Sequence, residues 1–359
     1  MGNLSNSQVI MGASIIGLFL GSAFLTYKVG SEEDQDDLDY TTETTETTTE
    51  KNNTEADELN KELDALLSQS DKEDLTKDIH VVKQEVTNTD PYEDLDKMVG
   101  LESVKAEVKS LANYVKLMKE REAQGLKSPR VTYHCVFSGN PGTGKTTIAR
   151  ILARIYKDLG VVTKGHLVET DRSGLVGQYV GQTAPKTNAI VDQAIGGVLF
   201  IDEAYSLTQD DDSYGEEAIA TLLKRMEDDR DNLVVIVAGY TNEMKKFIET
   251  NPGLQSRFTR YIDFPDYTPD ELYKIFEARM QPYSISLSPE AQTALRSALE
   301  TAVKKKTRNF GNGRYVRNLF ESAVTNMANR LSDGKNHTVE ELNTLSASDI
   351  NLALKQVKM

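Results

Sequence analysis

The sequence predicts an α/β fold in which helices cover both faces of a central parallel sheet, followed by a small all-α second domain. From Leu95 onward, short apolar runs alternate with amphipathic helical stretches, a pattern typical of parallel strands joined by helices. After about Tyr267 the strand-like runs stop and only helical patterns follow. The divisions that we expect are residues 1–30, 31–90, 91–266 and 267–359.

The first of these segments contains an uncharged run of 19 residues from Val9 to Tyr27, VIMGASIIGLFLGSAFLTY. A helix of that length spans roughly 28 Å, close to the ~30 Å hydrocarbon core of a bilayer. Lys28 follows the run and no basic residue precedes it, which favours a signal anchor over a cleaved signal peptide. We therefore predict a single-pass membrane anchor with the rest of the chain in the cytoplasm; a buried or cleaved segment is the alternative.

The net charge of −15 is concentrated in the second segment. Residues 31–90 hold 20 acidic and 5 basic side chains, whereas residues 91–359 hold 36 acidic and 35 basic ones. Residues 31–54 are rich in Thr and poor in large apolar groups, so we expect a disordered acidic tether, with a short helix indicated between residues 55 and 75. The near-neutral remainder argues against a nucleic-acid partner, which requires a basic surface.

Four apolar runs predict buried strands, and the amphipathic stretches between them predict helices. The strands are VTYHCVFSG, GHLVET, GGVLFIDEA and NLVVIVAGY, and the helices are TTIARILARIYKDLG, APKTNAIVDQAIG and EAIATLLKRMEDD. Further helices are indicated near 269–280, 288–304, 313–331 and 347–357. The only cysteine, Cys135, lies in the first strand, so we expect it to pack as a small apolar side chain rather than to react.

The segment GNPGTGKTT matches the phosphate-binding P-loop motif G-x-x-x-x-G-K-[ST] (Walker A). It follows a predicted strand and opens a predicted helix, so backbone N–H groups and the positive end of the helix dipole would face the phosphates. Lys145 is expected to reach the β- and γ-phosphates, and the Thr146 hydroxyl to bind Mg²⁺. The nucleotide-binding residues predicted here are Gly139, Asn140, Pro141, Gly142, Thr143, Gly144, Lys145, Thr146 and Thr147.

A pair of acidic residues, Asp202 and Glu203, ends the strand in GGVLFIDEA, 57 residues after Lys145. Asp202 is the predicted second Mg²⁺ ligand and part of the nucleotide site (Walker B). Glu203 is the predicted group that orients and polarises the attacking water. The two motifs together predict nucleotide hydrolysis with Mg²⁺.

With these motifs in place, the stretch from about Leu95 to the C-terminus resembles the AAA+ ATPases of the CbbX/SpoVK group, which includes the red-type Rubisco activases. The segments that carry the resemblance are MVGLESVKAEV, GNPGTGKTTIARILARIY, GHLVETDRSGLVGQYVGQTA, GGVLFIDEAYSL and NPGLQSRF. The resemblance implies a P-loop AAA+ domain with a small α-helical lid domain, ATP as the nucleotide, and assembly into a homo-oligomeric ring, usually a hexamer.

The resemblance also implies two catalytic residues before the lid. VVIVAGYTN resembles the sensor-1 strand, whose polar residue positions the water; Thr241 is the first candidate and Asn242 the alternative, since the register departs from the usual Thr-Asn ending. Arg257 resembles the arginine finger that enters the neighbouring subunit's site, with Arg260 as the second candidate. An arginine held in a surface ion pair is the alternative for both.

Two more segments complete the resemblance. GNGRYVRNLFESA resembles the sensor-2 helix, which implies that Arg317 reaches the γ-phosphate, with Arg314 one turn earlier; bracing of the lid is the alternative. GLVGQYVGQTA resembles the central pore loop. There Tyr179 is expected to stand on an exposed loop and contact a protein client through its ring, unless it packs on the core.

The expected function is that of a membrane-tethered AAA+ ATPase that couples ATP hydrolysis to remodelling or partial unfolding of a protein client through a ring pore. One alternative is a nucleotide-gated membrane scaffold with little motor activity. A second is an AAA+ motor that acts on nucleic acid, against which the charge balance argues.

Overall fold

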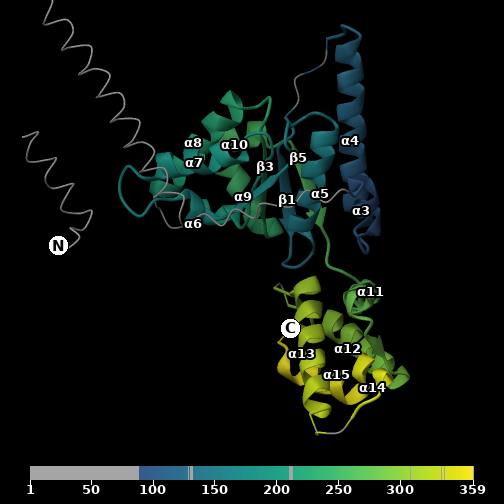
Figure 1. Ribbon diagram of the computed structural model, residues 1–359. Coiled ribbons are helices and arrows are strands. Elements are labelled where there is room, and N and C mark those ends of the chain that lie inside the picture. Colours follow the sequence, from purple (N-terminus) through teal and green to yellow (C-terminus); the bar gives the residue numbers. More distant parts are fainter. Residues whose placement is uncertain are drawn as a thin grey trace, which may run out of the picture. The chain divides into compact units, whose positions relative to one another are not determined.

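The computed structural model describes residues 89–127, 129, 132–209, 213–307, 309–332, 334 and 336–358 (Figure 1). The predicted membrane anchor and almost all of the predicted acidic tether lie outside these residues. None of the helices in the described residues has the length and apolarity that a membrane crossing requires.

The central sheet has five strands, all parallel, in the order β2-β3-β4-β1-β5. Phe137 of β1 pairs with Ala238 of β4 on one side and with Ile262 of β5 on the other. The prediction of a parallel sheet is confirmed. The strands are β1 (Cys135–Gly139), β2 (Leu167–Thr170), β3 (Val198–Ile201), β4 (Val234–Gly239) and β5 (Arg260–Phe264).

Two apolar clusters cover the two faces of this sheet, because successive side chains of a strand point to opposite faces. Along β3, Val198 and Phe200 belong to one cluster, and Leu199 and Ile201 to the other. The helices that pack in the first cluster are α3 (Pro91–Lys97), α4 (Glu102–Ala123) and α5 (Lys145–Asp158), which are labelled together in Figure 1. The second cluster is formed with α6 (Arg172–Leu175), α7 (Thr183–Ala194), the 3-10 helix η1 (Ala204–Thr208), α8 (Ser213–Asp228), α9 (Thr241–Glu249) and α10 (Pro252–Arg257).

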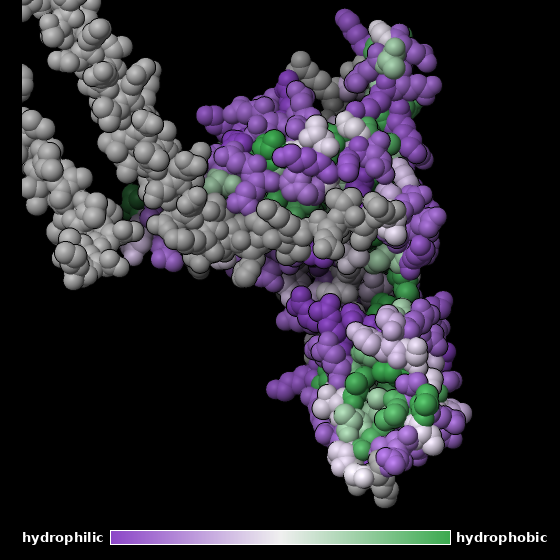
Figure 2. Space-filling model, viewed as in Figure 1, coloured by the Kyte–Doolittle hydropathy of each residue, from purple (hydrophilic) through white to green (hydrophobic). Residues whose placement is uncertain are grey.

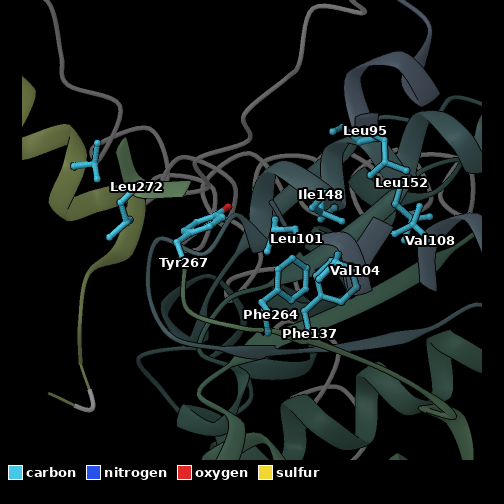
Figure 3. Close-up of a cluster of buried hydrophobic side chains, with 14 of the residues drawn as sticks. Leu95, Leu101, Val104, Val108, Phe137, Ile148, Leu152, Phe264, Tyr267 and Leu272 are labelled. Atoms are coloured by element: carbon cyan, nitrogen blue, oxygen red, sulfur yellow. The ribbon is translucent and has the colours of Figure 1, made fainter. Parts of the chain in front are cut away.

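The first cluster continues into the helical C-terminal part of the chain. Figure 3 shows Tyr267 between Leu101, which precedes α4, and Leu272 of the lid. The rings of Phe137 in β1 and Phe264 in β5 lie next to each other, and their centroids are 5.0 Å apart. The buried side chains of the lid therefore belong to the same apolar cluster as one face of the sheet.

The lid is built mainly of helices that begin at side-chain caps. Thr268 forms a capping box with Glu271 at the start of α11, and Ser346 forms one with Asp349 at the start of α15. The Asp349 carboxylate is 1 % exposed and accepts from the guanidinium of Arg330, 2.9 Å away, which ties α13 to α15. The helices are α11 (Pro269–Met280), the 3-10 helix η2 (Gln281–Tyr283), α12 (Pro289–Lys305), α13 (Asn312–Arg330), α14 (Val339–Asn343) and α15 (Ala347–Gln356).

The prediction that this second domain is all-α needs a small correction. Ser286–Leu287 (β6) and Thr344–Leu345 (β7) form a two-stranded parallel pair. Strands of two residues give no periodic pattern, so the sequence carries no signal for them.

Figure 2 shows apolar side chains gathered on the surface of the lid. Three large apolar side chains of the lid helices are exposed: Val339 and Leu342 of α14 and Leu352 of α15.

Cys135 at the start of β1 is fully buried, as predicted. Its Sγ lies 3.4 Å from the carbonyl oxygen of Tyr133 and 3.9 Å from the hydroxyl of Tyr156. Burial raises the pKa of the thiol to about 12. The thiolate, which is the reactive form, is therefore absent at neutral pH.

Candidate active site

A cavity of about 500 Å³ lies at the carboxyl ends of β1, β3 and β4, the edge at which parallel α/β sheets bind ligands. It brings together the P-loop, the acidic pair after β3 and two helices of the lid. The predicted site residues that line it are Gly139, Pro141, Gly142, Gly144, Lys145, Thr146, Thr147, Asp202, Glu203, Arg314 and Arg317.

The P-loop takes its shape from glycine conformations that other residues rarely adopt. Gly139 has a φ of 146°, and a Cβ there would lie 2.4 Å from the carbonyl oxygen of Phe264 in β5. Gly142 has a φ of 70°, also in the region that favours glycine. The loop can therefore turn directly from β1 into α5, whose first residue is Lys145.

The ammonium group of Lys145 is held over this loop. Its Nζ donates to the carbonyl oxygens of Gly139 and Asn140, at 2.8 and 2.9 Å. Burial lowers the pKa of Lys145, while the nearby Asp202 acts in the opposite direction. A partly desolvated cation held at a helix N-terminus provides a strong point of attraction for a phosphate.

Two predicted P-loop residues, Asn140 and Thr143, support the loop instead of lining the cavity. The Thr143 hydroxyl is buried and donates to the carbonyl oxygen of Asn140 at 2.8 Å. The hydroxyl of Tyr267 donates to the carbonyl oxygen of Thr143 at 3.1 Å. The Asn140 amide donates to Asp266 at 2.8 Å. These three hydrogen bonds hold the backbone of the P-loop in place.

Asp202 and Glu203 follow β3 as predicted and both reach the cavity. Glu203 has a φ of 49°, in the left-handed region. This conformation is unfavourable for residues other than glycine and costs about 1–3 kcal/mol. Its N–H donates to the Asp202 carboxylate at 3.1 Å. The strained turn directs both carboxylates to the same cavity.

The lid contributes a third arginine to the cavity, which the sequence analysis missed. Arg279 of α11 lines the cavity together with Arg314 and Arg317 of α13. Burial, followed by the positive charge of Arg317, lowers the pKa of Arg279. The segment PDELYKIFEARM looks like an ordinary amphipathic helix, so nothing local in the sequence distinguishes Arg279 from a surface arginine.

The charge of the cavity is opposite to that of the whole chain. Five of its lining residues are basic (Lys97, Lys145, Arg279, Arg314 and Arg317) and two are acidic. Such a concentration of cations suits a polyphosphate. The cavity is also lined by Met98, Val99, Ile275 and Ala278, apolar side chains that suit a flat base.

The remaining predicted residues lie elsewhere. The Thr241 hydroxyl donates to Asp263 at 3.3 Å, and it is Gly239 and Tyr240, not Thr241 or Asn242, that line the cavity. Arg257 ends α10 and lies 3.7 Å from Glu227, whereas Arg260 lies over the ring of Tyr114. The sensor and finger roles of these residues stay predictions.

Tyr179 lies on the loop between α6 and α7 and is 67 % exposed, and the neighbouring Val180 is 86 % exposed. The alternative that Tyr179 packs on the core therefore does not hold. The loop presents two large apolar side chains to solvent, and neither of them lines the cavity.

The donors available for Mg²⁺ fit a shared site. Thr146 and Asp202 supply a hydroxyl and a carboxylate at the cavity, hard oxygen ligands of the kind that Mg²⁺ prefers. The described residues contain no cluster of three or more His, Cys, Asp or Glu that could hold a metal. A Mg²⁺ ion here would therefore complete its coordination with phosphate oxygens and water.

Comparison with known proteins agrees with the fold and the cavity. Residues 135–266 match the family described as "ATPase family associated with various cellular activities (AAA)", and residues 268–358 match the AAA lid domain. The chain resembles the solved AAA domain of FIGL-1 in complex with ADP, with a TM-score of 0.57 and 20 % identity over 80 % of this chain and 90 % of that one. That likeness shows the fold.

The curated relatives narrow the family. Stage V sporulation protein K of Bacillus subtilis (strain 168) is 41 % identical over 262 residues, covering 72 % of this chain and 81 % of that protein. Protein CbbX of Cereibacter sphaeroides is 43 % identical over 263 residues, covering 72 % of this chain and 84 % of that protein. The chain belongs to the AAA family of ATPases, in the group of CbbX and stage V sporulation protein K, and it is an ATP hydrolase.

Proposed function

We propose that this ATPase works as a homo-oligomeric, hexameric ring that uses ATP hydrolysis to remodel or partly unfold a protein client through its central pore. The observation that carries the proposal is the exposure of Tyr179 and Val180 on a loop bounded by Gly177 and Gly181. Two exposed large apolar side chains cost free energy in water and gain it on contact with a polypeptide. The near-neutral charge of residues 91–359 supports a protein client over nucleic acid.

The cavity residues have defined roles in this proposal. Lys145 and the P-loop N–H groups bind the β- and γ-phosphates, and Thr146 and Asp202 hold Mg²⁺. Glu203 orients the attacking water and accepts its proton. Arg317 from the lid reaches the γ-phosphate. These groups supply the positioning and the positive charge on which phosphoryl transfer depends.

Two catalytic residues of the proposal act from outside the cavity of one subunit. Arg257 enters the site of the neighbouring subunit, which explains why it lies away from its own chain's cavity. Thr241 acts as the sensor-1 residue and helps to position the water, with its hydroxyl held by Asp263. Its turn toward the nucleotide requires release of that 3.3 Å contact.

The client is identified by trapping it on a subunit that binds ATP without hydrolysing it. Glu203→Gln removes the carboxylate that activates water and keeps the P-loop. The full-length variant is incubated with ATP and a host extract, and co-purified proteins are identified by mass spectrometry. The matched control is the double variant Glu203→Gln/Tyr179→Ala.

A protein that is enriched with Glu203→Gln and lost with the double variant supports the proposal and names the client. A ring that holds ATP and enriches the same proteins in both variants contradicts it and favours a nucleotide-gated scaffold. Failure of the trap variant to bind ATP contradicts the assigned cavity itself.

We further propose that residues 9–27 anchor the ring to a membrane, with the ATPase part in the cytoplasm. The support is their length and lack of charge. The full chain should stay with membranes after carbonate extraction, and a chain lacking residues 1–30 should be released while it retains ATP hydrolysis. Release of the full chain by carbonate would refute the anchor.

A further inference from the structure

Asn312, the first residue of α13, is completely buried at the junction of the lid and the P-loop. Its amide nitrogen lies within hydrogen-bond distance of Asp266 at 2.8 Å, of the carbonyl oxygen of Phe310 at 3.1 Å and of that of Pro141 at 3.3 Å. Its amide oxygen accepts from the backbone N–H of Tyr267 at 3.0 Å. One side chain thus contacts the nucleotide loop, the segment that leads to the lid and the residues before α13.

The backbone of Asn312 is adapted to this place. Its φ is 44°, in the left-handed region, which asparagine tolerates better than most residues that have a side chain. Glycine would tolerate the same φ but has no side-chain amide to make these hydrogen bonds. The position therefore requires both an unusual backbone conformation and a side chain with donors and an acceptor.

Asp266 is the second member of this junction. Its carboxylate accepts from Asn140 of the P-loop, from Asn312 of the lid and from Lys306, at 2.8, 2.8 and 2.6 Å. Burial alone would raise the pKa of Asp266, but the hydrogen bonds from these three residues outweigh it and lower the pKa. The Asp266 carboxylate is therefore favoured in its ionised form, in which it accepts from the P-loop and from the lid.

The P-loop and the start of α13 also touch through their backbones. The N–H of Gly313 donates to the carbonyl oxygen of Gly142 at 3.0 Å. A Cβ on Gly142 would lie 2.2 Å from the carbonyl oxygen of Gly311 and 2.7 Å from the backbone nitrogen of Arg314. The first turn of α13, which carries Arg314 and leads to Arg317, is thus fitted directly against the phosphate-binding loop.

The contacts form a continuous path from the catalytic lysine to the lid. Lys145 donates to the carbonyl oxygen of Asn140, the Asn140 side chain donates to Asp266, and Asp266 accepts from Asn312. The peptides of Asn140 and Pro141 therefore lie between the lysine of the nucleotide loop and the Asp266–Asn312 pair at the start of the lid.

We propose that Asn312 and Asp266 are positioning residues, which hold the lid arginine Arg317 in a fixed place relative to the P-loop. A nucleotide bound to the P-loop then has its γ-phosphate within reach of Arg317. The inference rests on the role of Arg317 in the proposed function. Neither Asn312 nor Asp266 lines the cavity, so both act through other residues.

The test is a double-mutant cycle in the full-length protein. Asn312→Ala, Arg317→Ala and the double variant are compared with wild type for the kcat and KM of ATP hydrolysis and for thermal unfolding. Asn318→Ala is the matched control, because Asn318 is an exposed asparagine on the same helix. Asn312→Ala should lower kcat about tenfold or more and change KM far less, and the double variant should be no slower than Arg317→Ala.

Additive losses in the double variant would assign Asn312 an effect independent of Arg317 and would overturn the inference, as would a wild-type kcat in Asn312→Ala. A wild-type kcat in Arg317→Ala would remove that arginine from the proposed function, a separate failure. If Asn312→Ala loses its cooperative unfolding transition, Asp266→Asn carries the same cycle, because it keeps the side-chain shape and removes the charge that holds Lys306 and both amides.

Discussion

The imidazole of His134 and the ring of Phe258 have centroids 6.0 Å apart, which places a buried histidine against the residue that follows Arg257. His134 is 3 % exposed, and its Nδ1 accepts from the N–H of Val235 at 2.9 Å. It also makes a hydrogen bond to the backbone of Met226. The histidine thus joins β4 and α8 beneath the end of α10, the segment that presents Arg257.

This histidine should make folding stability depend on pH. Burial, and then the charge of Arg257, lower the pKa of His134 from 6.5 to about 4. Because the folded state binds this proton less tightly than the unfolded state, neutral His134 contributes to the free energy of unfolding. That contribution is fully present above pH 6.5, the ordinary pKa, and is lost as the pH falls toward 4, the pKa in the folded state. The loss should be roughly 3 kcal/mol of unfolding free energy.

Urea unfolding of wild type and His134→Asn between pH 7.5 and 4 measures this effect. Asparagine cannot titrate, so the variant should be less stable at neutral pH but lose less of its stability on acidification. Carboxylates contribute equally to both proteins, and the difference between the two curves isolates His134. Parallel curves would show that His134 does not carry this pH dependence.

Gly142→Ala should separate steric contact from backbone strain at the P-loop. The new Cβ would meet the carbonyl oxygen of Gly311 at 2.2 Å, so it should push the lid away and weaken ATP binding about tenfold or more. Gly125→Ala is the control: its φ of 73° is nearly the same, and nothing lies within 4 Å of its added Cβ.

Calorimetric titration with ATP and thermal unfolding should be carried out on both glycine variants. Each should lose about 1 kcal/mol of stability from the unfavourable φ, whereas only Gly142→Ala should lose ATP affinity. Equal ATP affinities in the two variants would contradict close packing of the lid on the loop.

Mixing two inactive variants should restore hydrolysis if Arg257 acts in a neighbouring subunit. Arg257→Ala should reduce kcat by ~10³ or more, and Glu203→Gln should also be inactive. In a mixed ring, a site is complete where an Arg257→Ala subunit, which keeps its own Glu203, receives Arg257 from a neighbouring Glu203→Gln subunit. With equal amounts and random mixing, about a quarter of the sites meet this condition.

Steady-state ATP hydrolysis at varied mixing ratios is the readout, with a maximum expected near equal amounts. The corresponding mixture with Arg260→Ala tests the second candidate. Activity that never exceeds that of the separate variants would argue that Arg257 acts only within its own chain, for example through Glu227.

Tyr179→Ala should uncouple hydrolysis from work on a client. Because Tyr179 lies outside the cavity, basal ATP hydrolysis should stay within about twofold of wild type, whereas remodelling of the client found by trapping should fall about tenfold or more. Tyr261→Ala, which removes a 55 % exposed tyrosine on β5, is the control. Full remodelling by Tyr179→Ala would refute the role of the loop.

The sequence predicted those strands and site residues whose signals are local. β1, β3 and β4 lie inside the sheet and are apolar on both faces, so each appears as a continuous apolar run. β5 is an edge strand in which Arg260, Tyr261 and Asp263 are not buried, and it was not predicted. The P-loop and the Asp202–Glu203 pair were found because a few adjacent residues define each motif.

Residues whose role depends on distant contacts could not be found in this way. Asn312 lies 171 residues along the chain from Pro141, whose carbonyl oxygen it contacts, and Arg279 reaches the cavity from α11 of the lid. The register of Thr241 was ambiguous for a similar reason: its hydroxyl donates to Asp263 of β5, a strand that β1 separates from β4.

The buried thiol of Cys135 makes the chain convenient for spectroscopic labelling. It is the only cysteine among 359 residues, and its burial and a pKa of about 12 keep it from thiol-directed dyes and spin labels. Cysteines introduced in pairs on the surface, one on the sheet domain and one on α12 or α15, would therefore be labelled without background. Distances between such labels would report lid movement during ATP turnover in the otherwise native protein.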